Sequence, residues 1–174
     1  MGNVRLYGST SGYTELAPPA VAPDGVLSLP SGVGTLLTAE GGKVLQIVRA
    51  TDTTARTTTS TSFVDVTGMA VTITPTAATS RVIIVAVFMG QAVGSGRVSF
   101  QITDSSNTVL SGAEDMQMTG SQNNYNNFNF WGYIESGTVS PATYKLRMKR
   151  NSATSVAANN DLNTGQMYAI EVSA

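Results

Sequence analysis

Cysteine and histidine are both absent from this chain of 174 residues. Without cysteine there is no disulfide, no thiolate nucleophile and no cysteine-ligated zinc. Without histidine the chain lacks the commonest general base and the commonest metal ligand, and no Ser–His arrangement can form. We therefore expect a protein that is not an enzyme and that uses no cofactor and no metal.

Charge is also scarce, because Asp, Glu, Lys and Arg make up 12% of the chain against about 25% in a typical soluble domain. The net charge of −1 offers no basic field to attract nucleic acid. The longest apolar run, residues 82–89, is far shorter than the roughly 20 residues that span a bilayer. No signal peptide is visible, so we expect synthesis in a cytoplasm and no nucleic-acid or membrane partner.

Proline is unevenly distributed, since four of the six prolines lie before residue 41. This stretch holds three short apolar bursts, at 4–7, 13–16 and 26–29, and none is long enough to form a core. A disordered tail is one interpretation, but regularly placed Leu, Tyr and Val favour an extended arm that orders against another chain. We predict an arm over 1–40 and a compact domain over 41–174. The predicted anchoring residues are Leu6, Tyr7, Tyr13, Leu16, Val26, Leu27 and Leu29.

From residue 43 onward, short strands alternate with turn signals, and no segment shows a helical apolar period. The pattern predicts an all-β sandwich or barrel. The run at 81–93 is mostly apolar, which predicts a central strand at a sheet or subunit interface. Turns are predicted at 104–107 and 159–161, and a hairpin tip at Gly94-Ser95-Gly96. The other predicted strands are 44–51, 62–66, 69–74, 97–103, 108–110, 114–118, 125–135, 144–150 and 166–172.

Several stretches of the chain carry distinctive motifs. Residues 8–20 read GSTSGYTELAPPA, residues 27–32 read LSLPSG, and KVLQ follows at 43–46. This combination resembles a recurrent segment of phage tail-fibre and virion-appendage proteins. Residues 59–68, TSTSFVDVTG, and 71–75, VTITP, resemble domains of phages of aquatic bacteria. The strand order and the closing YAIEV at 168–172 resemble a trimeric jelly-roll β-sandwich of the tumour-necrosis-factor or complement-head kind.

The resemblance implies a virion location and a homotrimer, and it carries no catalytic motif. Fibres of this kind usually have a tail-attachment region upstream, whereas this chain begins at the arm. We therefore expect a capsid decoration (cement) protein on the capsid surface, whose partner is the major capsid protein of the phage head. The alternative is the receptor-binding tip of a tail fibre that recognises host surface glycan. A secreted cytokine-like or lectin module is disfavoured because cysteine and N-x-S/T sites are absent.

The aromatic segment 125–135 alternates between two faces. Phe128, Phe130 and Ile134 share the face expected in the core. The opposite face combines amides with aromatic rings, which suits a subunit interface and can also stack on sugars. The predicted trimer interface consists of Val85, Val87, Asn127, Asn129, Trp131 and Tyr133.

Basic residues are concentrated on the segment 144–150, where the apolar Tyr144, Leu146 and Met148 alternate with charge. The simpler interpretation is a solvated outer face or an edge strand protected by charge. The functional interpretation is docking to an acidic surface such as a capsid shell. The predicted docking residues are Lys145, Arg147, Lys149 and Arg150.

Carboxylates give no coherent acid pair for hydrolysis, because the adjacent Glu114 and Asp115 point to opposite faces of a strand. The turns at 104–107 and 159–161 carry oxygen ligands that suit Ca²⁺ in type. Neither turn has the spacing of a calcium loop, so we interpret both as ordinary turns. The remaining acidic candidates are Asp65, Asp104, Glu135, Asp161 and Glu171.

Overall fold

The computed structural model describes residues 43–121 and 124–174 in full, and the backbone of two short strands before them. The chain divides into two units, Met1–Thr38 and Ala39–Ala174. In the first unit β1 (Val4–Tyr7) pairs antiparallel with β2 (Tyr13–Leu16). Four of the predicted anchoring residues, Leu6, Tyr7, Tyr13 and Leu16, lie on this pair. Val26, Leu27 and Leu29 lie outside the described residues, and the role of the arm stays a prediction.

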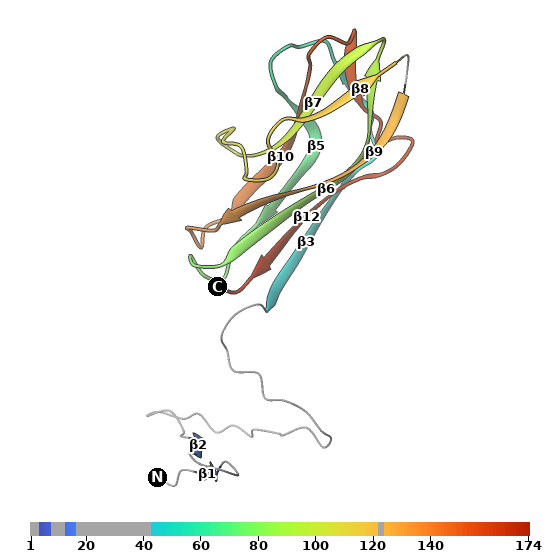
Figure 1. The fold of residues 1–174 in the computed structure, drawn as a ribbon. Coiled ribbons are helices and arrows are strands. Elements are labelled where there is room, and N and C mark those ends of the chain that lie inside the picture. Colours follow the sequence, from blue (N-terminus) through green and yellow to red (C-terminus); the bar gives the residue numbers. More distant parts are fainter. Residues whose placement is uncertain (1–3, 8–12, 17–42, 122–123) are drawn as a thin grey trace. The chain divides into compact units, whose positions relative to one another are not determined.

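The second unit is an antiparallel β-sandwich (Figure 1), which confirms the predicted all-β, jelly-roll-like fold. The first sheet has the order β5-β10-β7-β8. The second sheet has the order β3-β12-β6-β9. At residues 90–93 of β6, strand β11 pairs with β6, and β4 pairs with β11. The strands are β3 Val44–Asp52, β4 Arg56–Thr58, β5 Val64–Ile73, β6 Arg81–Val93, β7 Gly96–Asp104, β8 Met116–Gly120, β9 Asn124–Glu135, β10 Ala142–Arg150, β11 Ser155–Ala158 and β12 Gly165–Val172.

The core lies between the two sheets and is built by alternation along each strand. The predicted inward residues of β5, β7 and β10 are all buried, as are alternate residues of β6 and β12. Phe88 of β6 occupies the centre, with ring centroids 4.9 Å from Phe100, 5.1 Å from Phe128 and 5.9 Å from Phe130. This aromatic cluster joins β6 and β9 of the second sheet to β7 of the first.

Two predicted boundaries are wrong. The separate strands at 62–66 and 69–74 form the single strand β5, in which Gly68 has a φ of 94°. The pairing of β5 with β10 shifts register at this place, so the expected break is a β-bulge. The strand predicted at 108–110 is reduced to an isolated bridge between Thr103 and Val109. The short strands β4 and β11 were not predicted, because three or four residues give too little alternation to recognise.

The turn Gly94-Ser95-Gly96 is not the tip of a hairpin. It connects β6 to β7, which belong to different sheets, so the chain crosses from the second sheet to the first here. Gly96 has a φ of 142°, and a side chain on it would meet the backbone of Ser152 and Ala153. The glycine therefore lets two backbone segments approach closely at the corner of the sandwich.

The polar residues of β7 also differ from expectation. Ser99, Gln101 and Thr103 point away from the core as predicted, yet all three are buried. Asn151 covers this side of the strand by donating from Nδ2 to Ser99 Oγ at 2.7 Å. The bridge to Val109 brings the segment after β7 against Thr103. Strand alternation therefore predicts the direction of these side chains, whereas their burial depends on segments that are distant in the sequence.

Candidate interaction surface

The second sheet has one face on the core and one face directed outward. Strand register aligns the outward residues into rows that cross four strands. The first row is Arg49, Tyr168, Val85 and Trp131, from β3, β12, β6 and β9. The second row is Ile47, Ile170, Ile83 and Tyr133, and the third is Thr51, Gln166, Val87 and Asn129. We call these rows, with the adjacent pair Met89 and Asn127, the outer face.

All six residues of the predicted trimer interface lie on the outer face. Val85 is directly opposite Trp131, and Val87 is directly opposite Asn129. Tyr133 and Asn127 occupy the flanking positions of the same strand. The pairing of β9 with β6 thus brings together side chains that are 46 and 42 residues apart in the sequence. Whether another molecule covers them stays a prediction.

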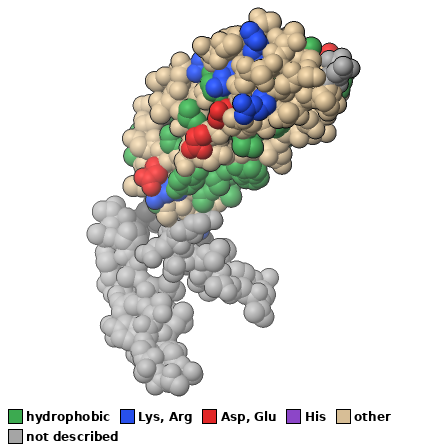
Figure 2. All heavy atoms as spheres, turned by 45° about the horizontal axis from the view of Figure 1, so that its top comes forward, with side chains coloured by type: hydrophobic (Ala, Val, Ile, Leu, Met, Phe, Trp, Pro, Cys, Tyr) green, Lys and Arg blue, Asp and Glu red, His purple; other side chains and the backbone are tan. Residues whose placement is uncertain are grey.

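Large apolar side chains are exposed on the outer face. Trp131 is 52% exposed, Tyr133 44% and Ile47 61%. Val85 is only 6% exposed because it lies in the middle of the first row, and an interface would gain little from it. Figure 2 shows hydrophobic side chains gathered into a patch on the surface of the second unit. An apolar patch bordered by polar groups is typical of an interaction site.

Several residues of the outer face were not predicted from the sequence. Ile47, Tyr168 and Ile170 complete the first two rows from β3 and β12. Alternation placed Tyr168 and Ile170 on one side of a strand, but it could not say that this side faces outward. The alternating residue Glu171 suggests from the sequence that its own side faces outward, but Glu171 is fully buried, so Tyr168 and Ile170 face outward instead.

The outer face changes in character along the strands. The two rows at one end are apolar or aromatic except for Arg49, whose guanidinium lies 5.8 Å from the Tyr168 ring centroid. The other end carries amides: Asn163 Nδ2 donates to Asn127 Oδ1 at 3.3 Å, and Asn159 Nδ2 donates to Gln91 Oε1 at 3.3 Å. An apolar area beside hydrogen-bonding amides is the composition of a subunit interface with a core and a polar rim.

The packing of β9 on the core fixes the position of the outer face. Phe128 and Phe130 pack against Phe88 on the inward side of β9. Gly132 of the same strand is buried, and a side chain on it would meet Leu110 at 3.0 Å. Since β9 is held by these inward contacts, Trp131 and Tyr133 are directed outward on a rigid strand.

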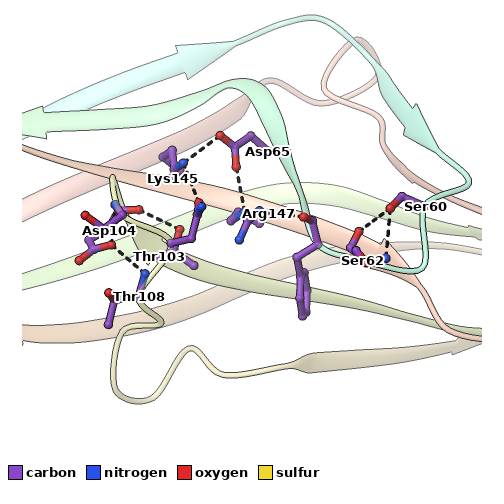
Figure 3. A network of polar contacts seen from close by, with 11 residues as sticks. Ser60, Ser62, Asp65, Thr103, Asp104, Thr108, Lys145 and Arg147 are labelled. Atoms are coloured by element: carbon purple, nitrogen blue, oxygen red, sulfur yellow. Dashed lines mark hydrogen bonds and ion pairs between the residues drawn. The ribbon is translucent and has the colours of Figure 1, made fainter.

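The basic residues of β10 are engaged within the chain (Figure 3). Asp65 lies between Lys145 and Arg147, at 2.9 Å from Lys145 Nζ and 2.8 Å from Arg147 Nε. Lys145 also donates to Asn107 Oδ1 at 3.0 Å, and Arg147 donates to the Phe63 carbonyl at 2.7 Å. Burial acts to raise the pKa of the Asp65 carboxyl, but the two cations outweigh it and hold that pKa below its usual value.

Two interpretations of the basic segment need correction. β10 lies between β5 and β7, so it is not an edge strand protected by charge. Arg150 alternates with the buried side and donates to the carbonyls of Thr59 and Ala153, so it does not share a face with Lys145, Arg147 and Lys149. Lys149 lies 4.4 Å from the centroid of the Phe63 ring. Docking through the three remaining residues stays a prediction.

The carboxylate Glu171 is fully buried and has a structural role. Its oxygens accept from Gln46 Nε2 at 2.6 Å and from Thr76 N and Oγ1, each at 2.8 Å. Burial acts to raise the pKa of Glu171, and these hydrogen bonds more than offset it, lowering the pKa to about 2. Glu171 therefore links β12 to β3 and to the loop before β6.

The two oxygen-rich turns are confirmed as turns. Asp104 Oδ1 accepts from the backbone N–H of Ser106 and of Thr108, each at 2.8 Å. The second turn closes when Leu162 N donates to the Asn159 carbonyl at 3.2 Å. Within residues 43–121 and 124–174, no three acidic side chains gather where a metal ion would bind. The described residues also form no apolar helix of membrane-spanning length.

Comparison with known proteins gives no match to any family model and none to a curated protein sequence. Among solved structures, a particle of the Gx strain of infectious bursal disease virus is similar at 14% identity and a TM-score of 0.44, covering 97% of this chain and 40% of the viral chain. The T13 particle of that virus gives 14% identity and a TM-score of 0.40, over 92% and 43% of the two chains. The D431N mutant VP2 protein of the virus, in T=1 particles, is similar at 15% identity and a TM-score of 0.36, covering 95% of this chain and 44% of the viral chain. This chain therefore spans less than half the length of the viral chains that it matches.

Proposed function

We propose that this chain is a non-enzymatic structural protein of a bacteriophage particle. It forms a homotrimer and decorates the head as a cement protein, binding the major capsid protein at the capsid surface. It acts by adhesion, so it needs neither cofactor nor catalytic group. Trp131, Tyr133 and Ile47 are the residues whose exposure carries this proposal.

The area of the outer face supports association with further copies of the chain. Four strands about 4.8 Å apart give a width of about 19 Å, and the seven residues from Asn127 to Tyr133 give a length of about 24 Å. The product is roughly 450 Å², compared with the roughly 800 Å² that each partner buries in a standard protein interface. The outer face would therefore supply somewhat more than half of each copy's share of a standard interface.

Trimerisation follows from the resemblance to jelly rolls of the tumour-necrosis-factor kind, in which an inner-sheet face surrounds a threefold axis. The outer face is the corresponding surface of this sandwich. Its apolar rows would pack near the axis, and its amide end would form the polar rim. Around a threefold axis each copy would offer one part of the outer face to one neighbour and a different part to the other neighbour, so that the ring closes after three copies without any other partner.

Attachment to the head is supported by two features away from the outer face. Residues 8–32 resemble the arm of phage virion appendages, and three cations, Lys145, Arg147 and Lys149, lie on the outward side of β10. In the proposed complex the arm lies along the shell or around neighbouring copies. Apolar burial repeated over many copies then stabilises the shell at about 25 cal/mol per Å² before ordering costs.

Two measurements test the proposal. Sedimentation equilibrium of the full chain should give three times the chain mass of 18.1 kDa, and a monomer at all accessible concentrations would contradict it. A variant without residues 1–40 should remain a folded trimer and should no longer co-sediment with emptied, tailless heads. Normal head binding by that variant would rule out the arm as the anchor.

A receptor-binding tip of a tail fibre is the second candidate, and a specific observation favours it. Tyr125 is exposed beside Asn127 and Asn129 at the amide end of β9, and such a combination of ring and amides can stack on and hydrogen-bond a sugar. A glycan array distinguishes the two functions. Specific binding of a host surface glycan favours the tip, and co-purification with tailless heads favours decoration.

A further inference from the structure

Within residues 43–121 and 124–174, strand β9 forms an edge of the second sheet. It pairs along its length with β6 and, among the described residues, its only other backbone partner is Ser111, whose carbonyl accepts from Tyr133 N at 2.9 Å. The Ser111 bridge and the close approach of Gly112 to the Trp131 carbonyl cover the end of the strand. The segment from Asn124 to Phe130 lies before this covered end.

The direction of the free backbone groups follows from the bond to Ser111. In an antiparallel strand the N–H and C=O of one residue point to the same side, and the side alternates with each residue. Tyr133 donates away from β6, so Tyr125, Asn127 and Asn129 also direct their N–H and C=O away from β6. These three residues offer six hydrogen-bonding groups in a row, which is a template for one more strand.

The edge of β9 lacks the features that normally prevent such pairing. Residues 124–134 contain no charge and no proline, and the pairing with β6 runs over 12 residues without a register shift. The other edges are protected: β5 carries Asp65 and a bulge, β3 carries Arg49 and Asp52, and β8 and β4 have only five and three residues. Among the described edges, only β9 is long and regular and carries no charge before its last residue, Glu135.

We infer that the β9 edge of one copy pairs antiparallel with the β9 edge of a second copy, across a twofold axis near Asn127. With the axis at Asn127, that residue opposes its own copy, Tyr125 opposes Asn129, and on the other side of the strand Asn126 opposes Phe128 and Asn124 opposes Phe130, so no charges oppose one another. The occupant is a second copy because the strand is complementary to itself and the same residues satisfy both edges. In the paired form the two second sheets become one continuous sheet through β9.

This contact is separate from the association through the outer face. The outer face uses side chains perpendicular to the sheet, whereas the edge uses backbone groups in the plane of the sheet. Both contacts can exist in one particle. In that case the twofold contact joins one trimer to the next.

The absence of cysteine from the chain makes a direct test available. Single variants Tyr125→Cys, Asn127→Cys and Asn129→Cys each carry one thiol, and Val139→Cys, at a residue 56% exposed outside β9, is the matched control. Residues at a twofold axis between antiparallel strands have Cα atoms about 4.5–5.5 Å apart, which suits a disulfide, whereas a residue two positions away is about 13 Å from its equivalent.

Oxidation with copper phenanthroline should therefore give a disulfide-linked dimer with a sharp maximum at one β9 position, at least tenfold above the control. Equal crosslinking at Val139→Cys, or none at any β9 position, would overturn the inference.

A second pair of variants separates the contribution of the backbone from that of the side chain. Asn127→Pro removes an outward N–H without touching the pairing to β6, and Asn127→Ala removes only the amide side chain.

In solution, the Asn127→Pro variant should lose the oligomers that contain an even number of copies of the chain, and the Asn127→Ala variant should keep them. Even-numbered species that persist in a folded Asn127→Pro variant would overturn the inference. The Trp131→Ala variant keeps this test distinct from the proposed function. If the outer face is the threefold contact, Trp131→Ala loses trimers and keeps crosslinked dimers, so the failure of either contact is visible by itself.

Discussion

Replacing Trp131 with alanine tests the outer face with little effect on the fold of the monomer. The indole stands outward from β9, 52% exposed, in the first row beside Val85. The ring cluster that holds β9 to the core is formed by Phe128 and Phe130 on the opposite side of the strand. The free energy of unfolding of the monomer should therefore change little, and the association of copies should change strongly.

The size of the effect follows from the exposed area. A tryptophan presents up to roughly 250 Å², so the exposed half amounts to about 130 Å² and to about 3 kcal/mol at 25 cal/mol per Å². A trimer loses this contribution three times, about 10 kcal/mol, which corresponds to roughly seven powers of ten in the association constant. Because the midpoint concentration of a trimer varies as the square root of that constant, it should rise about a thousandfold.

The assay is sedimentation velocity over a dilution series at constant salt. Val139→Ala, a truncation of an equally exposed apolar residue outside the outer face, is the matched control and should leave the midpoint unchanged. Urea unfolding of both variants verifies that the fold is kept. A Trp131→Ala protein that assembles at the concentration of the unchanged chain would refute the assignment of the outer face as an interface.

Three further predictions concern the fold that supports this face. Glu171→Gln should destabilise the protein near neutral pH. The pKa of the folded carboxyl is about 2 against an ordinary 4.5, so the unchanged chain should lose on the order of 3 kcal/mol of stability as pH falls from about 4.5 to 2. Urea titrations of the variant should lack this dependence on pH. Phe100→Ala should cost about 3–5 kcal/mol in the same assay, because the ring is fully buried against Phe88 and Phe128; a loss below about 1 kcal/mol would contradict the packing described. Gly96→Ala should lower the midpoint of thermal unfolding clearly more than Gly137→Ala, since both glycines have positive φ but only Gly96 lies against backbone; equal shifts would refute this reason.

Much of the sandwich could be predicted because strand alternation is a local property. Met69, Val71 and Ile73 repeat every second residue, and so do Val98, Phe100 and Ile102, so their shared burial follows from the geometry of a strand. The same rule placed Trp131 and Tyr133 on one face of β9. Where the chain departs from simple alternation, as at the bulge around Gly68, the prediction divided one strand into two.

The parts that could not be predicted depend on pairing between distant segments. The sequence does not say that β10 lies between β5 and β7, so an edge strand protected by charge stood beside a solvated outer face as an interpretation of its basic residues, and only the edge interpretation is wrong. It also does not say that Gln46 and Thr76 meet Glu171, 125 and 95 residues away, and bury its carboxylate. The rows of the outer face depend on the same register between strands, which is why Ile47 was missed.

The proposed role as a structural component of a phage head makes a definite prediction of where the protein lies on the particle. Particles that carry the protein can be labelled with antibody against the β-sandwich and imaged by electron microscopy. We predict label distributed over the head shell, lost when residues 1–40 are deleted. Label confined to the far end of the tail, or particles without the protein, would contradict a decoration role.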